Sequence, residues 1–228
     1  MYRYFAFSVM LLSVLSLARA DVTFQFSVNT SSISGTAGSL DFQFNPGPLV
    51  SQAASLEILN VTTNGAFAGA PVLTGDVSGG SLPMPVTFDN LTPFNDYFQG
   101  FTFGSSLVFD IRLFGPAVNT PDGTSSSGST FAFSMFSDAA GTIPTLTTNI
   151  AAGFAFTIDV NLDGTTTVTN YSAQTTVLPV ISGVPEPSSL ALLGIGVIGL
   201  GIMRRRRPST LVTQRCSLPP GLLSCKAE

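Results

Sequence analysis

The segment Leu107-Val108-Phe109-Asp110-Ile111-Arg112-Leu113 decides the fold class. Its large apolar residues occupy every second position, and the charged Asp110 and Arg112 stand between them. Successive side chains of a β-strand point to opposite faces of the sheet, so this spacing predicts a strand with one buried face and one solvated face. The buried face would carry Leu107, Phe109, Ile111 and Leu113.

The same period of two recurs along the chain as Phe-x-Phe pairs. They stand at Phe24/Phe26, Phe42/Phe44, Phe101/Phe103, Phe131/Phe133 and Phe154/Phe156. Stretches rich in Gly, Pro, Asn and Ser separate these runs, and no amphipathic helix longer than about one turn is expected between them. Short strands at regular spacing over residues 21–183 predict an all-β fold, a single β-sandwich or jelly-roll-like domain.

Composition excludes several function classes. The 228-residue chain has no His, which rules out Ser–His–Asp triads, Cys–His dyads and His-ligated zinc. Residues 21–183 hold eleven acidic residues and one basic residue, a net charge of −10. That charge repels a phosphate backbone, so nucleic acid is not an expected partner. The same residues contain no Cys, so the domain must be held together by core packing.

The N-terminus has the three parts of a secretory signal peptide. Arg3 supplies a basic residue, Phe5–Leu17 is an apolar stretch, and Ala18-Arg19-Ala20 is an A-x-A cleavage pattern. We expect residues 1–20 to direct the chain to the Sec export machinery and to be removed after Ala20. Residues 21–183 would then form an extracytoplasmic domain.

The C-terminal region combines three elements in order. Val184-Pro185-Glu186-Pro187 is followed by the uncharged segment Ser188–Met203 and then by Arg204-Arg205-Arg206-Arg207. Sixteen helical residues cover about 24 Å, which suffices for a short transmembrane helix whose arginines reach the interface. The positive-inside rule orients these arginines toward the cytoplasm. The pattern predicts an inner-membrane anchor at 188–203 and a cytoplasmic tail at 208–228.

This ordered set over residues 184–207 resembles the PEP-CTERM sorting signal. The resemblance implies processing near the Pro-Glu-Pro by an exosortase and release to the cell surface or the extracellular polysaccharide matrix of a Gram-negative bacterium. The chain departs from the usual pattern because it continues through residues 208–228. The domain itself is similar to an uncharacterised family of PEP-CTERM proteins, at 38–44, 94–101 and 104–111, which implies one domain and no particular activity.

One local motif has the residue types of a calcium loop. Asp159, Asn161 and Asp163 followed by Gly164 match the first six positions of the D-x-N-x-D-G pattern, whose alternate oxygen ligands converge on a hard cation. The twelfth position is Asn170 instead of a bidentate carboxylate. The alternative is a β-hairpin in which strand 154–160 turns at Asp163-Gly164 into a strand over 165–171. Calcium is the one cofactor that the sequence suggests.

The densest aromatic cluster allows two interpretations. Its rings could form a sugar-binding platform with Tyr97 exposed, or they could fill the core. The cluster consists of Phe94, Tyr97, Phe98, Phe101 and Phe103.

We therefore expect an exported protein with a structural or adhesive role and no enzymatic activity. Its partners would be the exosortase, the Sec machinery, the inner membrane before processing, and extracellular polysaccharide. A carbohydrate-binding surface module, calcium-dependent or not, is the first alternative. A glycoside hydrolase that uses two carboxylates is the second, although the sequence singles out no pair of acids and no catalytic residue.

Overall fold

The computed structural model describes residues 20–180, and their regular secondary structure is almost entirely β-strand. Residues 1–19 of the signal peptide, the sorting signal at 184–207 and the tail at 208–228 lie outside the described residues. The strands are β1 (Val22–Asn29), β2 (Ala37–Pro46), β3 (Ser55–Thr63), β4 (Ala66–Thr74), β5 (Val77–Gly79), β6 (Val86–Asp89), β7 (Asp96–Thr102), β8 (Ser106–Phe114), β9 (Ser129–Phe136), β10 (Phe154–Val160), β11 (Thr166–Asn170) and β12 (Thr175–Val180).

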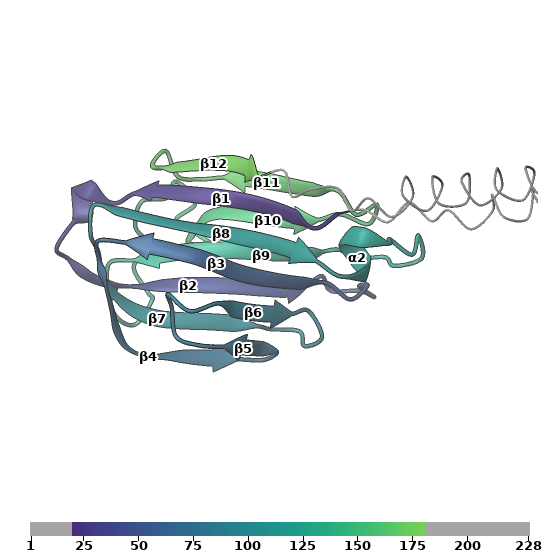
Figure 1. Cartoon of the computed structure of the whole chain (residues 1–228). Helices are drawn as coiled ribbons and strands as arrows, with labels where there is room; N and C mark the ends of the chain where they lie inside the picture. Colours follow the sequence, from purple (N-terminus) through teal and green to yellow (C-terminus); the bar gives the residue numbers. More distant parts are fainter. Residues whose placement is uncertain (1–19, 181–228) are drawn as a thin grey trace, which may run out of the picture. The chain divides into compact units, whose positions relative to one another are not determined.

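These strands form two six-stranded antiparallel sheets (Figure 1). One sheet, sheet A, has the order β12-β1-β8-β3-β6-β5, and the other, sheet B, has the order β11-β10-β9-β2-β7-β4. The predicted all-β sandwich is confirmed. Helical structure in the described part is limited to a 3₁₀ turn at Ser31–Ile33 and the single turn α2 (Pro116–Asn119), and no helix there is long and apolar enough to span a membrane.

The segment that decides the fold class forms β8, between β1 and β3 in sheet A. Its alternation is observed as predicted, because Leu107, Phe109, Ile111 and Leu113 are fully buried while Asp110 and Arg112 keep solvent contact. The strand therefore has one face in the core and one outside.

Phenylalanine rings from both sheets meet in one core. The rings of Phe26 on β1 and Phe156 on β10 stack with centroids 3.8 Å apart. Phe109 on β8 packs edge-on against Phe133 on β9 at 5.2 Å and against Phe42 on β2 at 5.5 Å. Such ring pairs stabilise beyond the area that they bury. This core joins the sheets in a domain that has no disulfide.

Both ends of the described chain leave the sandwich at the same end. β1 and β12 pair in antiparallel register from Thr23↔Val180 to Val28↔Thr175, so the start of β1 lies beside the end of β12 (Figure 1). The loops 47–54, 90–95, 115–128 and 161–165 lie at this end too, and we call it the terminal end. The buried side chain of Asn90 links its own loop to the 47–54 loop and to the start of β9. It accepts a hydrogen bond from Ala54 N and donates hydrogen bonds to Gln52 O and Ser129 Oγ.

Candidate functional site

The predicted calcium motif lies in a β-hairpin. β10 and β11 pair from Val160↔Thr166 to Phe156↔Asn170, and Gly164 takes a positive φ of 76° in the turn. Glycine adopts this left-handed conformation without strain. The hairpin alternative is therefore the observed structure, with strand β10 at the expected residues 154–160.

The three proposed ligands are engaged in separate hydrogen bonds. Asp159 Oδ1 accepts from Thr130 Oγ1 at 2.6 Å, and Asp163 Oδ1 accepts from the backbone N of Thr165 at 2.9 Å. Asn161 Nδ2 donates to the hydroxyls of Thr165 and Thr167. These bonds explain the turn without a cation, and calcium binding at Asp159, Asn161 and Asp163 stays a prediction.

Tyr97 is not an exposed platform. The side chain is fully buried, its hydroxyl accepts from Leu82 N at 2.9 Å, and it bonds to Gln99 Oε1. Tyr97 stands two and four residues before Gln99 and Phe101, so it shares their face of β7, and that face is the core. The prediction of an exposed Tyr97 is wrong, and the core interpretation holds for Tyr97, Phe101 and Phe103. Phe94, in the loop before β7, is the exposed ring of the cluster.

Two concavities adjoin each other at the terminal end. One, of about 400 Å³, is lined by residues of the 46–51 and 90–93 segments. The other, of about 320 Å³, is lined by Thr130, Asp159, Asn161 and Leu162 together with 127–129, and Gly47 and Pro48 line both. Both are depressions open to solvent, not enclosed cavities.

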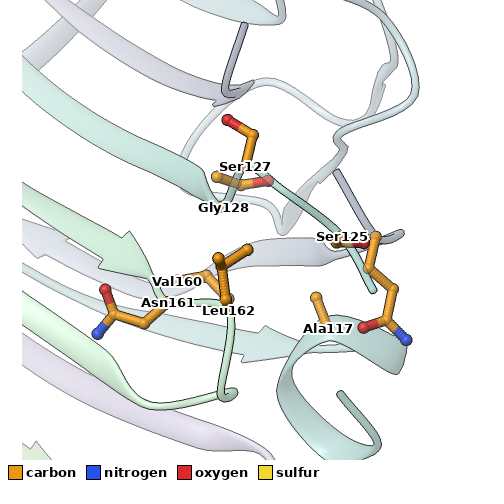
Figure 2. Close-up of a pocket in the computed structure, with 9 residues that line it drawn as sticks. Ala117, Ser125, Ser127, Gly128, Val160, Asn161 and Leu162 are labelled. Carbon is orange, nitrogen blue, oxygen red and sulfur yellow. The ribbon is translucent and has the colours of Figure 1, made fainter. Parts of the chain in front are cut away.

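A much smaller cavity lies beside the second concavity. Val160, Asn161 and Leu162 line it on one side and Ala117 of α2 and Gly128 on the others, and Figure 2 shows these residues. Its volume is about 10 Å³, which is room for about one water molecule. This cavity is a gap between α2 and the end of β10, and it is too small for any ligand larger than a water molecule.

Several large apolar side chains are exposed around these concavities. They are Leu49, Val50, Leu91 and Leu162, and Leu91 is 72% exposed. The concavities are also lined by Ser51, Thr130 and Asn161, which carry hydroxyl and amide groups. The terminal end thus combines apolar contacts with hydrogen-bonding groups.

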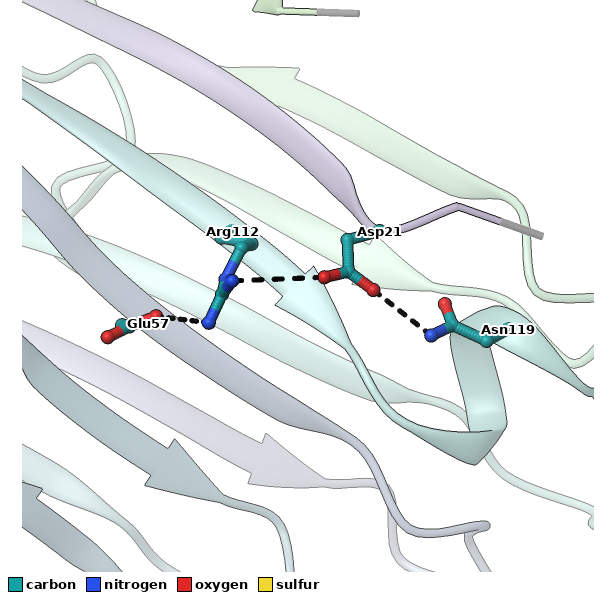
Figure 3. A network of polar contacts seen from close by, with 4 residues as sticks. All are labelled: Asp21, Glu57, Arg112 and Asn119. Atoms are coloured by element: carbon teal, nitrogen blue, oxygen red, sulfur yellow. Dashed lines mark hydrogen bonds and ion pairs between the residues drawn. The ribbon is translucent and has the colours of Figure 1, made fainter. Parts of the chain in front are cut away.

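Arg112, the one basic residue of 21–183, already forms ion pairs with acidic side chains of the domain. Its guanidinium donates to Glu57 on β3 and lies 3.9 Å from Asp21, whose carboxylate also accepts from Asn119 (Figure 3). It also stands 4.8 Å from the centre of the Phe114 ring. This network on sheet A ties the start of β1 to β3, β8 and α2.

A pair of acids on the outer face of sheet B was not found from the sequence. Asp41 stands on β2 between the core residues Leu40 and Phe42, and Asp96 starts β7 just before Tyr97. Both side chains therefore point away from the core. The register pairs Gln43 with Asp96 and Asp41 with Phe98, so the two acids are diagonal neighbours on adjacent strands.

The two carboxyl groups interact directly. Burial, followed by a hydrogen bond and charge repulsion from Asp96, raises the pKa of Asp41 to about 8, despite an opposing hydrogen bond from Gln43. Burial also raises the pKa of Asp96, while its bond to Asp41 lowers it. Such coupled acids share a proton because two adjacent buried carboxylates repel each other.

This pair does not have the geometry of a glycosidase. The two catalytic carboxyl groups lie about 5–5.5 Å apart in retaining enzymes and about 6.5–9.5 Å apart in inverting enzymes. The carboxyl groups of Asp41 and Asp96 are closer, because they share a hydrogen bond. Neither acid lines any of the three cavities described above. The absence of enzymatic activity stays a prediction.

Comparison with protein-family models identifies the C-terminal region. Residues 183–207 match the PEP-CTERM protein-sorting motif. The chain carries a PEP-CTERM sorting signal. The match contains Val184, Pro185, Glu186, Pro187 and the four arginines that the sequence singled out. PEP-CTERM proteins are exported and sorted by an exosortase, so this protein is an exported exosortase substrate with a β-sandwich before its sorting signal.

No curated protein and no solved structure matches the chain.

Proposed function

We propose that this PEP-CTERM protein is a structural or adhesive module of the cell surface or the extracellular polysaccharide matrix. The observation that carries the proposal is the sorting motif at 183–207, which follows a disulfide-free sandwich by only a few residues. The domain is lysine-free and strongly acidic, which suits solubility outside the cell. It is packed around one aromatic core.

The proposed route follows from the order of the signals. The Sec machinery exports the chain, cleavage after Ala20 leaves Asp21 as the new N-terminus, and Ser188–Met203 holds the protein in the inner membrane with the sandwich outside. Asp21 then keeps its ion pair with Arg112, and β1 starts one residue later. The exosortase processes the chain near Pro185-Glu186-Pro187 and ends this anchoring.

Replacing Pro185, Glu186 and Pro187 with alanine should trap the protein in the inner membrane of its native host. The exosortase reads this motif, so the extracellular amount should fall more than tenfold and the membrane-bound amount should rise. Cell fractionation with antibodies against the sandwich measures both. Alanine at Ser209, Thr210 and Leu211, beyond the arginines, is the matched control and should leave release unchanged. Equal release of both variants would contradict exosortase sorting through this motif.

Glycan binding at the terminal end is a second candidate function. It is supported by the two adjoining concavities, which combine exposed Leu91 and Leu162 with hydroxyl and amide groups. Sugars present apolar ring faces and hydroxyls, and this mixture of groups is complementary to both.

Alanine at Asn161 and Leu162 together should weaken binding to the host polysaccharide at least tenfold, because both side chains line the second concavity. A glycan array followed by titration of the bound sugars measures this. Leu178→Ala, at an exposed position on β12, is the control and should keep full binding. A wild-type protein that binds no glycan would remove this candidate and leave the sorting proposal standing.

A further inference from the structure

A polar network on sheet A holds the start of β1. Asp21 Oδ2 lies 3.9 Å from the Arg112 guanidinium, and Asp21 Oδ1 accepts a hydrogen bond from Asn119 Nδ2 at 3.1 Å (Figure 3). Arg112 also pairs with Glu57, so two carboxylates share one guanidinium and the network has a net charge of −1. One further positive charge would make it neutral.

One polar atom of this network has no hydrogen-bond partner. Asn119 Oδ1 is buried and accepts no hydrogen bond within the part of the chain that the structure describes. A buried acceptor without a donor carries a free-energy cost, so the atom requires an explanation. The nitrogen of the same carboxamide contacts Asp21, so a new donor on Asp21 would arise beside this oxygen.

The proposed cleavage after Ala20 creates such a donor. Hydrolysis of the Ala20–Asp21 peptide bond adds the hydroxyl of water to the Ala20 carbonyl carbon and a hydrogen to the Asp21 nitrogen. At pH 7 most of the new amine takes up a proton and becomes an ammonium group with three N–H donors. The peptide nitrogen before cleavage offers one donor and no charge.

We propose that the Asp21 ammonium group fixes the start of β1 once the signal peptide is removed. It donates to Asn119 Oδ1 and makes the network neutral, and hydrogen bonds of an ionised group are the strong ones. β1 lies between β12 and β8, so fixing its start supports two strand ladders. The inference rests on the proposed cleavage site and goes beyond it, because it makes the uncleaved precursor the less stable form.

The absence of lysine from 21–183 permits a selective test. An amine-specific acetylating reagent, applied to the exported protein in urea, modifies this domain at the Asp21 nitrogen and leaves a neutral amide there. After refolding, acetylation should lower the Tm by at least about 3 °C, as expected for the loss of one hydrogen bond to a charged group. Thermal unfolding followed by circular dichroism measures this against a mock-treated sample. An unchanged Tm would overturn the proposal.

A substitution at Asn119 identifies the partner of the ammonium group. Asn119→Ala has no Oδ1, so acetylation should lower its Tm by less than about 1 °C. Asn64→Ala, in the turn between β3 and β4 at the opposite end of the sandwich, is the matched control and should lose as much as wild type does on acetylation. Equal losses in Asn119→Ala and wild type would assign the effect to the charge alone and overturn the proposal.

Mass spectrometry separates this inference from the cleavage on which it rests. The exported protein should begin at Asp21. Another first residue would refute both the cleavage site and the contact with Asn119. A protein that begins at Asp21, with a Tm that acetylation does not change, would refute the contact alone. The proposal of sorting through the C-terminal motif stands in either case.

Discussion

Replacing Phe109 with alanine should lower the free energy of unfolding by about 3–5 kcal/mol. Phe109 is fully buried, and its ring lies within 6.2 Å of four other rings, Phe26 of its own sheet and Phe42, Phe133 and Phe156 of the opposite sheet. The substitution leaves a cavity between the sheets that neighbouring rings cannot fill without shifting. Domains of this kind are stable by about 5–15 kcal/mol, so this is a large share of the total.

Urea unfolding of the exported protein, followed by circular dichroism, measures the change. Phe94→Ala is the matched control, because Phe94 is 48% exposed in the loop before β7 and its removal should change stability by no more than about 0.5 kcal/mol. Similar midpoints for Phe109→Ala and Phe94→Ala would show that the aromatic core is not what holds the sheets together.

Raising the pH from 5 to 9 in the presence of a chelator should destabilise the protein by a few kcal/mol, on the order expected for a raised carboxyl pKa. Asp41 has a pKa of about 8 in the folded protein, and its usual value is 3.8. Between these values the folded state holds a proton that the unfolded state has lost. Stability is therefore greatest at the acidic end of this window and falls as the pH rises toward 8.

Asp41→Asn should remove most of this slope, because asparagine stays neutral throughout. Urea unfolding at pH 5, 6, 7, 8 and 9 measures it. Asp122 does not interfere, since hydrogen bonds from Ser125 and Thr124 lower its pKa to about 2, below this range. An equally steep loss of stability in Asp41→Asn would assign the effect to other groups.

The sheet structure could be predicted from local pattern alone. The period of two in 107–113 and in the Phe-x-Phe pairs indicates which face of those strands is buried, and Asp163-Gly164 indicates the turn between β10 and β11. The same rule, applied to Tyr97, would have placed it with Phe101 and Phe103 in the core. The prediction of an exposed Tyr97 was wrong because it did not follow this alternation.

The acid pair could not be predicted in this way. Asp41 and Asp96 are 55 positions apart, and they meet only because β2 and β7 pair in one particular register. The sequence does not specify which strands become neighbours, and a one-residue slip would move one acid to the other face. The concavities depend likewise on loops from both sheets that approach each other only in the folded domain.

The pairing of the first strand with the last determines how the domain responds to mechanical force. A pull applied along β12 runs parallel to its ladder with β1. The six register pairs from Thr23↔Val180 to Val28↔Thr175 then share the load as shear, instead of opening one after another. Tension along β12 is met first by this ladder and then by the pairing of β1 with β8.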